Sequence, residues 1–202
     1  MKKLLFLIAI FVLFFSCTTE DNTIITEKSY TGLPHRIEAQ NTRTSRANSD
    51  AEQHCISFPL IAGQYHNAGT VNVDLIDGEI VISYQSIGDW DVSGIHMDIS
   101  GCDNLTFPTT KSGNPRIGKF EYKSEHEDGI NQVDYFFNEH DLSDQFCVAF
   151  HAVVEDGNGN KETAWADGGL DFGGNSWAMY ASVNLSDLDC DKNSNGGNDT
   201  EE

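Results

Sequence analysis

The sequence predicts an all-β fold, an antiparallel β-sandwich of about eight strands that is braced by disulfides. Three observations support this prediction. Short segments with alternating apolar residues follow one another, separated by turns rich in Gly, Asn and Asp. We find no convincing amphipathic helix. Four cysteines follow an N-terminal segment typical of an exported chain, and an even number of cysteines in such a chain favours disulfides.

The clearest strand pair spans residues 70–85. Val71, Val73 and Leu75 alternate with polar residues, which places them on one face of a strand. Asp77-Gly78 follows, a dipeptide typical of a two-residue hairpin turn. Residues 79–85 then return with a second alternating pattern, so the segment is predicted to form a β-hairpin.

The rest of the predicted domain continues the same pattern. A loop surrounds Gly113-Asn114-Pro115, a second reverse turn occupies residues 156–160, and residues 139–145 could form a single helical turn. The further predicted strands are residues 90–99, 132–137, 146–155, 161–166 and 177–185. Closely spaced short strands of this kind favour a sandwich of two antiparallel sheets.

The N-terminus has the layout of an export signal. Lys2 and Lys3 precede twelve apolar residues, 4–15, which are too few to span a bilayer, since spanning needs about 20. Ser16 then precedes Cys17. This ending resembles the lipobox of bacterial lipoproteins, although Phe14 stands where that family prefers Leu or Val.

The lipoprotein resemblance implies cleavage before Cys17 and acylation of that cysteine, so that a lipid anchor holds the protein to a membrane. The N-terminal sequence is similar to lipoproteins of the Bacteroidota, which implies the outer membrane, on its periplasmic or cell-surface face. We therefore expect a signal peptide over 1–16, the lipidated Cys17 and a flexible tether over 17–53, the β domain over 54–190, and an acidic disordered tail over 191–202.

The charge balance narrows the choice of partners. The chain has 32 acidic residues against 12 basic ones, a formal net charge of −20. Such a chain repels nucleic acid and anionic lipid headgroups, so we expect no nucleic acid partner. The acidity promotes solubility, and it also attracts divalent cations or cationic partners.

The four cysteines after Cys17 can pair in three ways. We favour Cys55–Cys190, which would join the two ends of the predicted domain, together with Cys102–Cys147. A Cys-x-x-Cys pair is absent from the sequence, which argues against a zinc ribbon or a thioredoxin-type redox site.

Candidate metal ligands are present, although we expect no cofactor. Imidazole is a good zinc ligand, and His96, His126 and His151 are the set to consider, with His66 as a fourth histidine. None has a partner at chelating spacing, so structural hydrogen-bonding roles are the alternative.

Residues 191–202 match the spacing of a calcium-binding loop, but without flanking helices. The oxygen-rich run from Asp156 to Glu162 is a further calcium alternative, which a hairpin turn explains equally well.

Aromatic residues suggest a glycan-binding surface. Trp90, Trp165 and Trp177, with Asp167 nearby, could form a platform on which a sugar ring stacks while the carboxylate accepts hydroxyl hydrogen bonds. Core filling is the alternative role for tryptophans in a sandwich.

Several stretches resemble a domain that recurs in exported bacterial proteins and has no assigned activity. The most specific are Glu162-Thr163-Ala164-Trp165-Ala166 and Asn175-Ser176-Trp177-Ala178-Met179-Tyr180. This resemblance implies an extracytoplasmic β domain and transfers no catalytic residue.

Motifs of serine hydrolases, P-loop enzymes and dinucleotide-binding enzymes are absent from the sequence. We therefore expect a non-catalytic binding or structural protein of the cell envelope, with a glycan or envelope protein as ligand. The alternative is a metal-binding protein or metal-dependent hydrolase that uses the histidines.

Overall fold

The computed structural model describes residues 33–42, 54–127 and 129–190. Its elements are strands and short 3-10 helices. The strands are β1 (Arg36–Gln40), β2 (Ile56–Ala62), β3 (His66–Ile76), β4 (Glu79–Ser86), β5 (Asp91–Ser100), β6 (Tyr122–Glu125), β7 (Gln132–Asn138), β8 (Gln145–Glu155), β9 (Lys161–Ala166), β10 (Leu170–Asp171) and β11 (Met179–Asn184). The 3-10 helices are η2 (Ile117–Lys119), η3 (Glu139–Asp141) and η4 (Leu185–Leu188).

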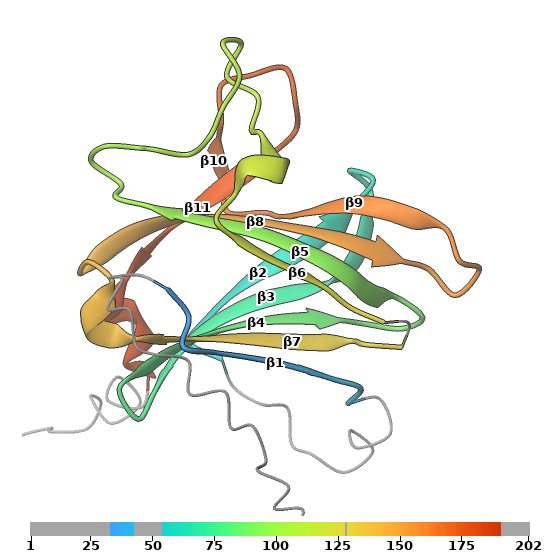
Figure 1. Cartoon of the computed structure of the whole chain (residues 1–202), viewed down its shortest axis with the longest axis horizontal. Coiled ribbons are helices and arrows are strands. Elements are labelled where there is room, and N and C mark those ends of the chain that lie inside the picture. The colour runs from blue at the N-terminus through green and yellow to red at the C-terminus, as the bar shows by residue number, and fades with distance from the viewer. Residues whose placement is uncertain (1–32, 43–53, 128, 191–202) are drawn as a thin grey trace, which may run out of the picture.

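The strands form one antiparallel sheet that curls into a half-barrel (Figure 1). The strand order is β1-β7-β4-β3-β2-β9-β8-β11-β10, and off this path β5 pairs with β8 and β6 pairs with β5. The all-β antiparallel class is therefore confirmed, whereas the expected sandwich of two separate sheets is not. Hydrogen bonding continues from β2 through β9 to β8, which joins what would be two sheets into one. Alternation along a strand shows which residues face inward, but it cannot tell two facing sheets from one curled sheet.

The predicted hairpin of β3 and β4 is present in the structure. Val73 lies opposite Ile82 and Leu75 opposite Ile80. Asp77 and Gly78 have φ angles of 52° and 83°, the left-handed values that a two-residue turn requires. Asp and Gly adopt this conformation more readily than other residues, so the local sequence fixes where the chain reverses.

The concave face of the curled sheet carries the main core. The side chains that alternate inward from nearly every strand pack there. The largest fully buried aromatic members of this core are Tyr84, Tyr135, Phe137, Phe146 and Phe150. Tyr84 contacts both Phe150 and Tyr135, with ring centroids 6.1 and 6.4 Å apart. The core thus joins β4 and β7 to β8 from the inside of the curl.

A second core lies on the outer face of β8 and β9. We call residues 101–121 and 167–178 the cap, because their two loops lie over this face (Figure 1, top). Phe107, Phe120 and Phe172 of the cap pack with Ala149 and Trp165 of the sheet. The two loops are joined at Asn114, whose Oδ1 accepts hydrogen bonds from the backbone N–H groups of residues 175 and 176 at 2.8 and 3.0 Å.

Both favoured disulfides are present. Cys55–Cys190 joins the residue before β2 to the end of the described chain, across 135 residues of sequence. Cys102–Cys147 ties the start of the cap to β8, across 45 residues. Chain-entropy arguments give a bond of this second kind a stabilising effect of about 4 kcal/mol.

Four strands were not predicted: β1, β2, β6 and β10. β1 pairs with β7 within the segment expected to be a tether, and all five of its residues are exposed, so it has no apolar alternation to detect. β6 and β10 are only four and two residues long. The single helical turn predicted near residue 139 is η3, a 3-10 helix.

Within the part of the chain that the structure describes, no helix is long and apolar enough to cross a bilayer. The signal 1–16, Cys17 and the tail 191–202 lie outside the described residues.

Replacing both Cys102 and Cys147 by Ser should lower the free energy of unfolding by roughly 2–4 kcal/mol, because the unfolded chain loses a cross-link. Urea denaturation measures this change. Amide hydrogen exchange should also accelerate in residues 101–121. The matched Cys55→Ser, Cys190→Ser variant should leave exchange in these residues slow, and equal acceleration in both variants would contradict a specific anchoring of the cap.

Candidate binding site

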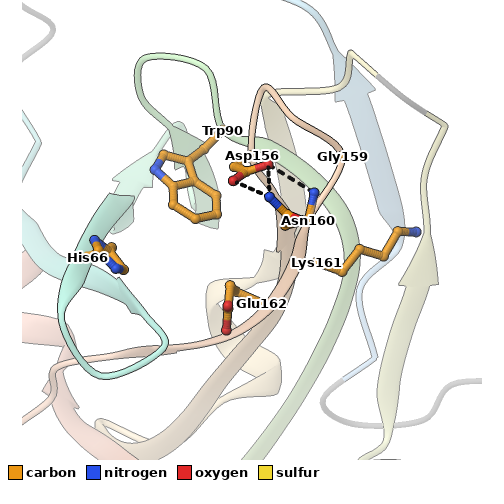
Figure 2. Close-up of a pocket in the computed structure, with 7 residues that line it drawn as sticks. All are labelled: His66, Trp90, Asp156, Gly159, Asn160, Lys161 and Glu162. Atoms are coloured by element: carbon orange, nitrogen blue, oxygen red, sulfur yellow. Dashed lines mark hydrogen bonds between the residues drawn. The ribbon is translucent and has the colours of Figure 1, made fainter.

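An open pocket of about 890 Å³ lies at the end of the sheet where β3 begins and β8 ends. The segments around it are the β2–β3 turn at residues 63–65, the β4–β5 connection at residues 87–90 and the β8–β9 turn at residues 156–160. The side chains and backbone that line it belong to His66, Trp90, Asp156, Gly159, Asn160, Lys161 and Glu162 (Figure 2).

The β2–β3 turn approaches β9 closely because residue 63 is glycine. Gly63 and Gln64 have φ angles of 55° and 74°, so two successive residues adopt the left-handed conformation. The Gly63 N–H donates to the carbonyl of Thr163 at 3.0 Å. A Cβ on residue 63 would lie 3.2 Å from Oε2 of Glu162, and glycine therefore leaves room for this carboxylate beside the turn.

The β8–β9 turn is held by the Asp156 carboxylate. Its Oδ1 accepts hydrogen bonds from the backbone N–H groups of Asn158 and Asn160, both at 2.9 Å, and the Asn160 side-chain amide donates to both oxygens. Hydrogen bonds from Asn160, and then from Asn158, lower the pKa of Asp156 to about 2. This carboxylate is therefore ionised at neutral pH. The predicted reverse turn accounts for the oxygen-rich composition that had suggested calcium.

Two aromatic rings flank the open space. The centroids of Trp90 and His66 lie 6.5 Å apart, with their planes inclined by 36°. Figure 2 shows His66, Trp90 and Glu162 around this space, while the Lys161 side chain points away from it. The Lys161 ammonium lies 3.5 Å from a carboxylate oxygen of Glu155. An indole face, an imidazole and a carboxylate thus face a solvent-accessible space together.

Trp90 is the one residue of the predicted glycan platform that lines this pocket. Trp165 is buried under the cap, where its ring meets Phe120 edge to face at a centroid distance of 6.2 Å. Trp177 is partly buried in the same second core. Asp167 is exposed just after β9, and its backbone N–H donates to the carbonyl of Pro59. Trp165 and Trp177 thus occupy the core-filling positions that were the alternative prediction.

The predicted histidine set divides into two places. His96 and His151 are opposite each other on β5 and β8, with ring centroids 5.2 Å apart. His126 Nε2 lies instead 2.7 Å from the Ser124 hydroxyl, which is also 2.6 Å from the Tyr135 hydroxyl. Among the described residues, no three His, Cys, Asp or Glu side chains are placed to hold a metal ion. The structure therefore does not bring the three histidines together.

His151 is the most unusual of the buried polar groups. It is fully buried between His96 and Trp165, and neither ring nitrogen has a hydrogen-bond partner in the part of the chain that the structure describes. Burial lowers the pKa of His151 to about 3, and the neighbouring His96 adds to the decrease. The imidazole of His151 is therefore neutral at physiological pH.

Asp98 lies on the same strand as His96. Burial raises the pKa of Asp98 to about 6, against the lowering effect of a hydrogen bond from the Glu121 N–H.

No protein-family model matches the chain, and comparison with curated proteins and with solved structures also finds no match. The role of the pocket must therefore be argued from its own residues. From the sequence, His66 was noted among the histidines and residues 156–162 as one oxygen-rich run. Neither was connected with Trp90. These residues meet through strand pairings between segments far apart in the chain, for which no local pattern gives a signal.

Acidification should destabilise the protein through His151. In the unfolded chain this imidazole has an ordinary pKa near 6.5, and in the folded chain the pKa is about 3, so the unfolded state binds more protons between these values. Stability from this group is complete above pH 6.5 and falls by about 3 kcal/mol by pH 4. The raised pKa of Asp98 acts in the opposite direction below pH 6 and offsets part of the loss.

The contribution of His151 is measured by comparing urea denaturation of the wild type and the His151→Phe variant from pH 7 to pH 4. The variant should lose less stability on acidification than the wild type, by about 3 kcal/mol. His140→Phe is the matched control, because the His140 side chain is 85% exposed and should not affect the pH dependence. Parallel pH profiles for the wild type and His151→Phe would refute the assignment.

Proposed function

We propose that the protein is a cell-envelope lipoprotein whose β domain binds a glycan, without catalysis, in the pocket between the three turns. The single observation that carries this proposal is the placement of the Trp90 and His66 rings beside the Glu162 carboxylate in an open, solvent-accessible space. A flat apolar face beside hydrogen-bonding groups is the combination that a pyranose ring requires, since its ring faces are apolar and its edges carry hydroxyls.

The polar groups of the pocket support a carbohydrate ligand further. Glu162 offers acceptor oxygens, and Asn160, whose side-chain amide donates to the Asp156 carboxylate, also lines the pocket. The turns that carry these groups are held by backbone hydrogen bonds and by the Asp156 carboxylate, so little ordering is needed on binding. An envelope protein that inserts an exposed side chain is the second class of ligand expected from the sequence.

The cell-envelope part of the proposal rests on the N-terminal sequence. Residues 2–17 have the charged, apolar and Ser-Cys layout of a lipoprotein signal. Acylated Cys17 would anchor the protein in the outer membrane, and the residues before β1 would connect this anchor to the domain. The acidic surface, with a net charge of −20, would keep the domain away from anionic headgroups.

Replacing Trp90 by Ala should reduce glycan affinity at least tenfold, because the stacking surface is lost. Replacing it by Phe should retain a measurable part of the affinity. A glycan array identifies the ligand, and calorimetry on residues 18–202 measures its affinity. Trp177→Phe is the control, since Trp177 lies in the second core away from the pocket. Unchanged binding by Trp90→Ala would place the ligand elsewhere on the domain.

Replacing Cys17 by Ser should abolish lipid attachment. When the full chain is expressed in a Gram-negative host, the wild type should incorporate labelled palmitate and partition into detergent, whereas the variant should do neither. Absence of label from the wild type would refute the lipoprotein assignment and leave the pocket unaffected.

A further inference from the structure

We propose that the pocket selects a saccharide with a free, positively charged amine over its neutral counterparts. This inference rests on the proposed glycan-binding function and specifies the class of sugar. Its basis is the charge of the groups around Trp90. Glu162 faces the open space and Asp156 is ionised, whereas Lys161 points away from the space and pairs with Glu155.

Two carboxylates line the pocket. Glu162 is exposed, lies beside Gly63, and faces the same open space as Trp90 and His66 (Figure 2). Asp156 stays ionised because the turn donates hydrogen bonds to its oxygens. A third carboxylate, of Asp89, lies next to this turn, since its Cβ is 3.0 Å from the place a Cβ on Gly157 would take. The potential inside the pocket is therefore negative.

Lys161 does not cancel this charge. Its ammonium points away from the space between Trp90 and Glu162 (Figure 2), and it lies 3.5 Å from the Glu155 carboxylate. The ion pair with Glu155 leaves Glu162 and Asp156 as the uncompensated charges facing a ligand. With a net charge of −20, the rest of the chain adds to the attraction of a cation at longer range.

The indole of Trp90 completes the site for an amine. An ammonium group near an indole face is attracted by the ring quadrupole, and a carboxylate next to the ring binds the same group by a charge-assisted hydrogen bond. A hydroxyl or an N-acetyl group in the same place gains neither attraction. For a solvent-accessible site, the two contributions together favour the amine about tenfold.

The test uses three disaccharides of the same size and linkage: a β-1,4-linked glucosamine dimer, its N-acetylated counterpart and cellobiose. Calorimetry on residues 18–202 at mildly acidic pH, where the amines of the glucosamine dimer are protonated, compares their affinities. The glucosamine dimer should bind about tenfold more tightly than the other two, and the isosteric Glu162→Gln variant should remove the preference. Glu139→Gln is the matched control, because Glu139 lies at the opposite end of the sheet, beside the β3–β4 turn.

Each outcome separates the two proposals. Equal affinity for all three sugars, or a preference that persists in Glu162→Gln, would overturn the amine selectivity and leave glycan binding intact. A preference that Glu139→Gln removes as fully as Glu162→Gln would also overturn it, because the general negative field would then suffice. If neither these sugars nor those of a glycan array bind, but a lysine-rich peptide does so through Glu162, both the sugar class and the proposed function would fall.

Discussion

Strand β8 is hydrogen-bonded along both of its edges. One edge pairs with β5 from Asp91 to Ser100, and the other pairs first with β11 and then with β9. Its alternating side chains consequently serve two cores, with Phe150 and Ala152 in the main core and Cys147 and Ala149 in the second. The curl of the sheet, the seating of the cap and the position of the turn at residues 156–160 all depend on this one strand. A Pro or a charged residue at its centre would disturb all three together.

The two ends of β8 differ in what they support. At its beginning, the disulfide to Cys102 holds the cap, and Ala149 packs in the second core. At its end, the chain passes into the turn organised by Asp156, where the pocket opens. Between them lies His151, a fully buried imidazole that has no hydrogen-bond partner among the described residues. The disulfide that braces the cap and the open pocket thus lie at opposite ends of a single strand, so a change in the pocket need not disturb the cap.

The sequence predicted the parts of the fold that have a local signal, and it missed the parts that depend on contacts between residues far apart in the chain. Alternation and the Asp-Gly turn predicted β3 and β4. The positions of Cys55 and Cys190 at the two ends of the predicted domain led to the observed pairing. β1 was not predicted because all of its residues are exposed, and an exposed edge strand needs no apolar alternation. Trp165 was grouped with Trp90 because sequence cannot tell a covered outer face from an open one, and only the packing of the cap makes Trp165 a core residue. The pocket itself depends on pairing of β2 with β9, which joins residues about a hundred positions apart.

The disulfide between Cys55 and Cys190 has a mechanical consequence. Its two Cα atoms are 5.3 Å apart, and every strand from β2 to β11 lies in the loop that it closes. Tension between the chain before Cys55 and the chain after Cys190 therefore passes through one covalent bond and bypasses the sheet. Among the described strands, β1 alone lies outside this loop, and it would be peeled from β7 under load. A domain built this way can be pulled by its ends while the pocket beside Trp90 keeps its shape.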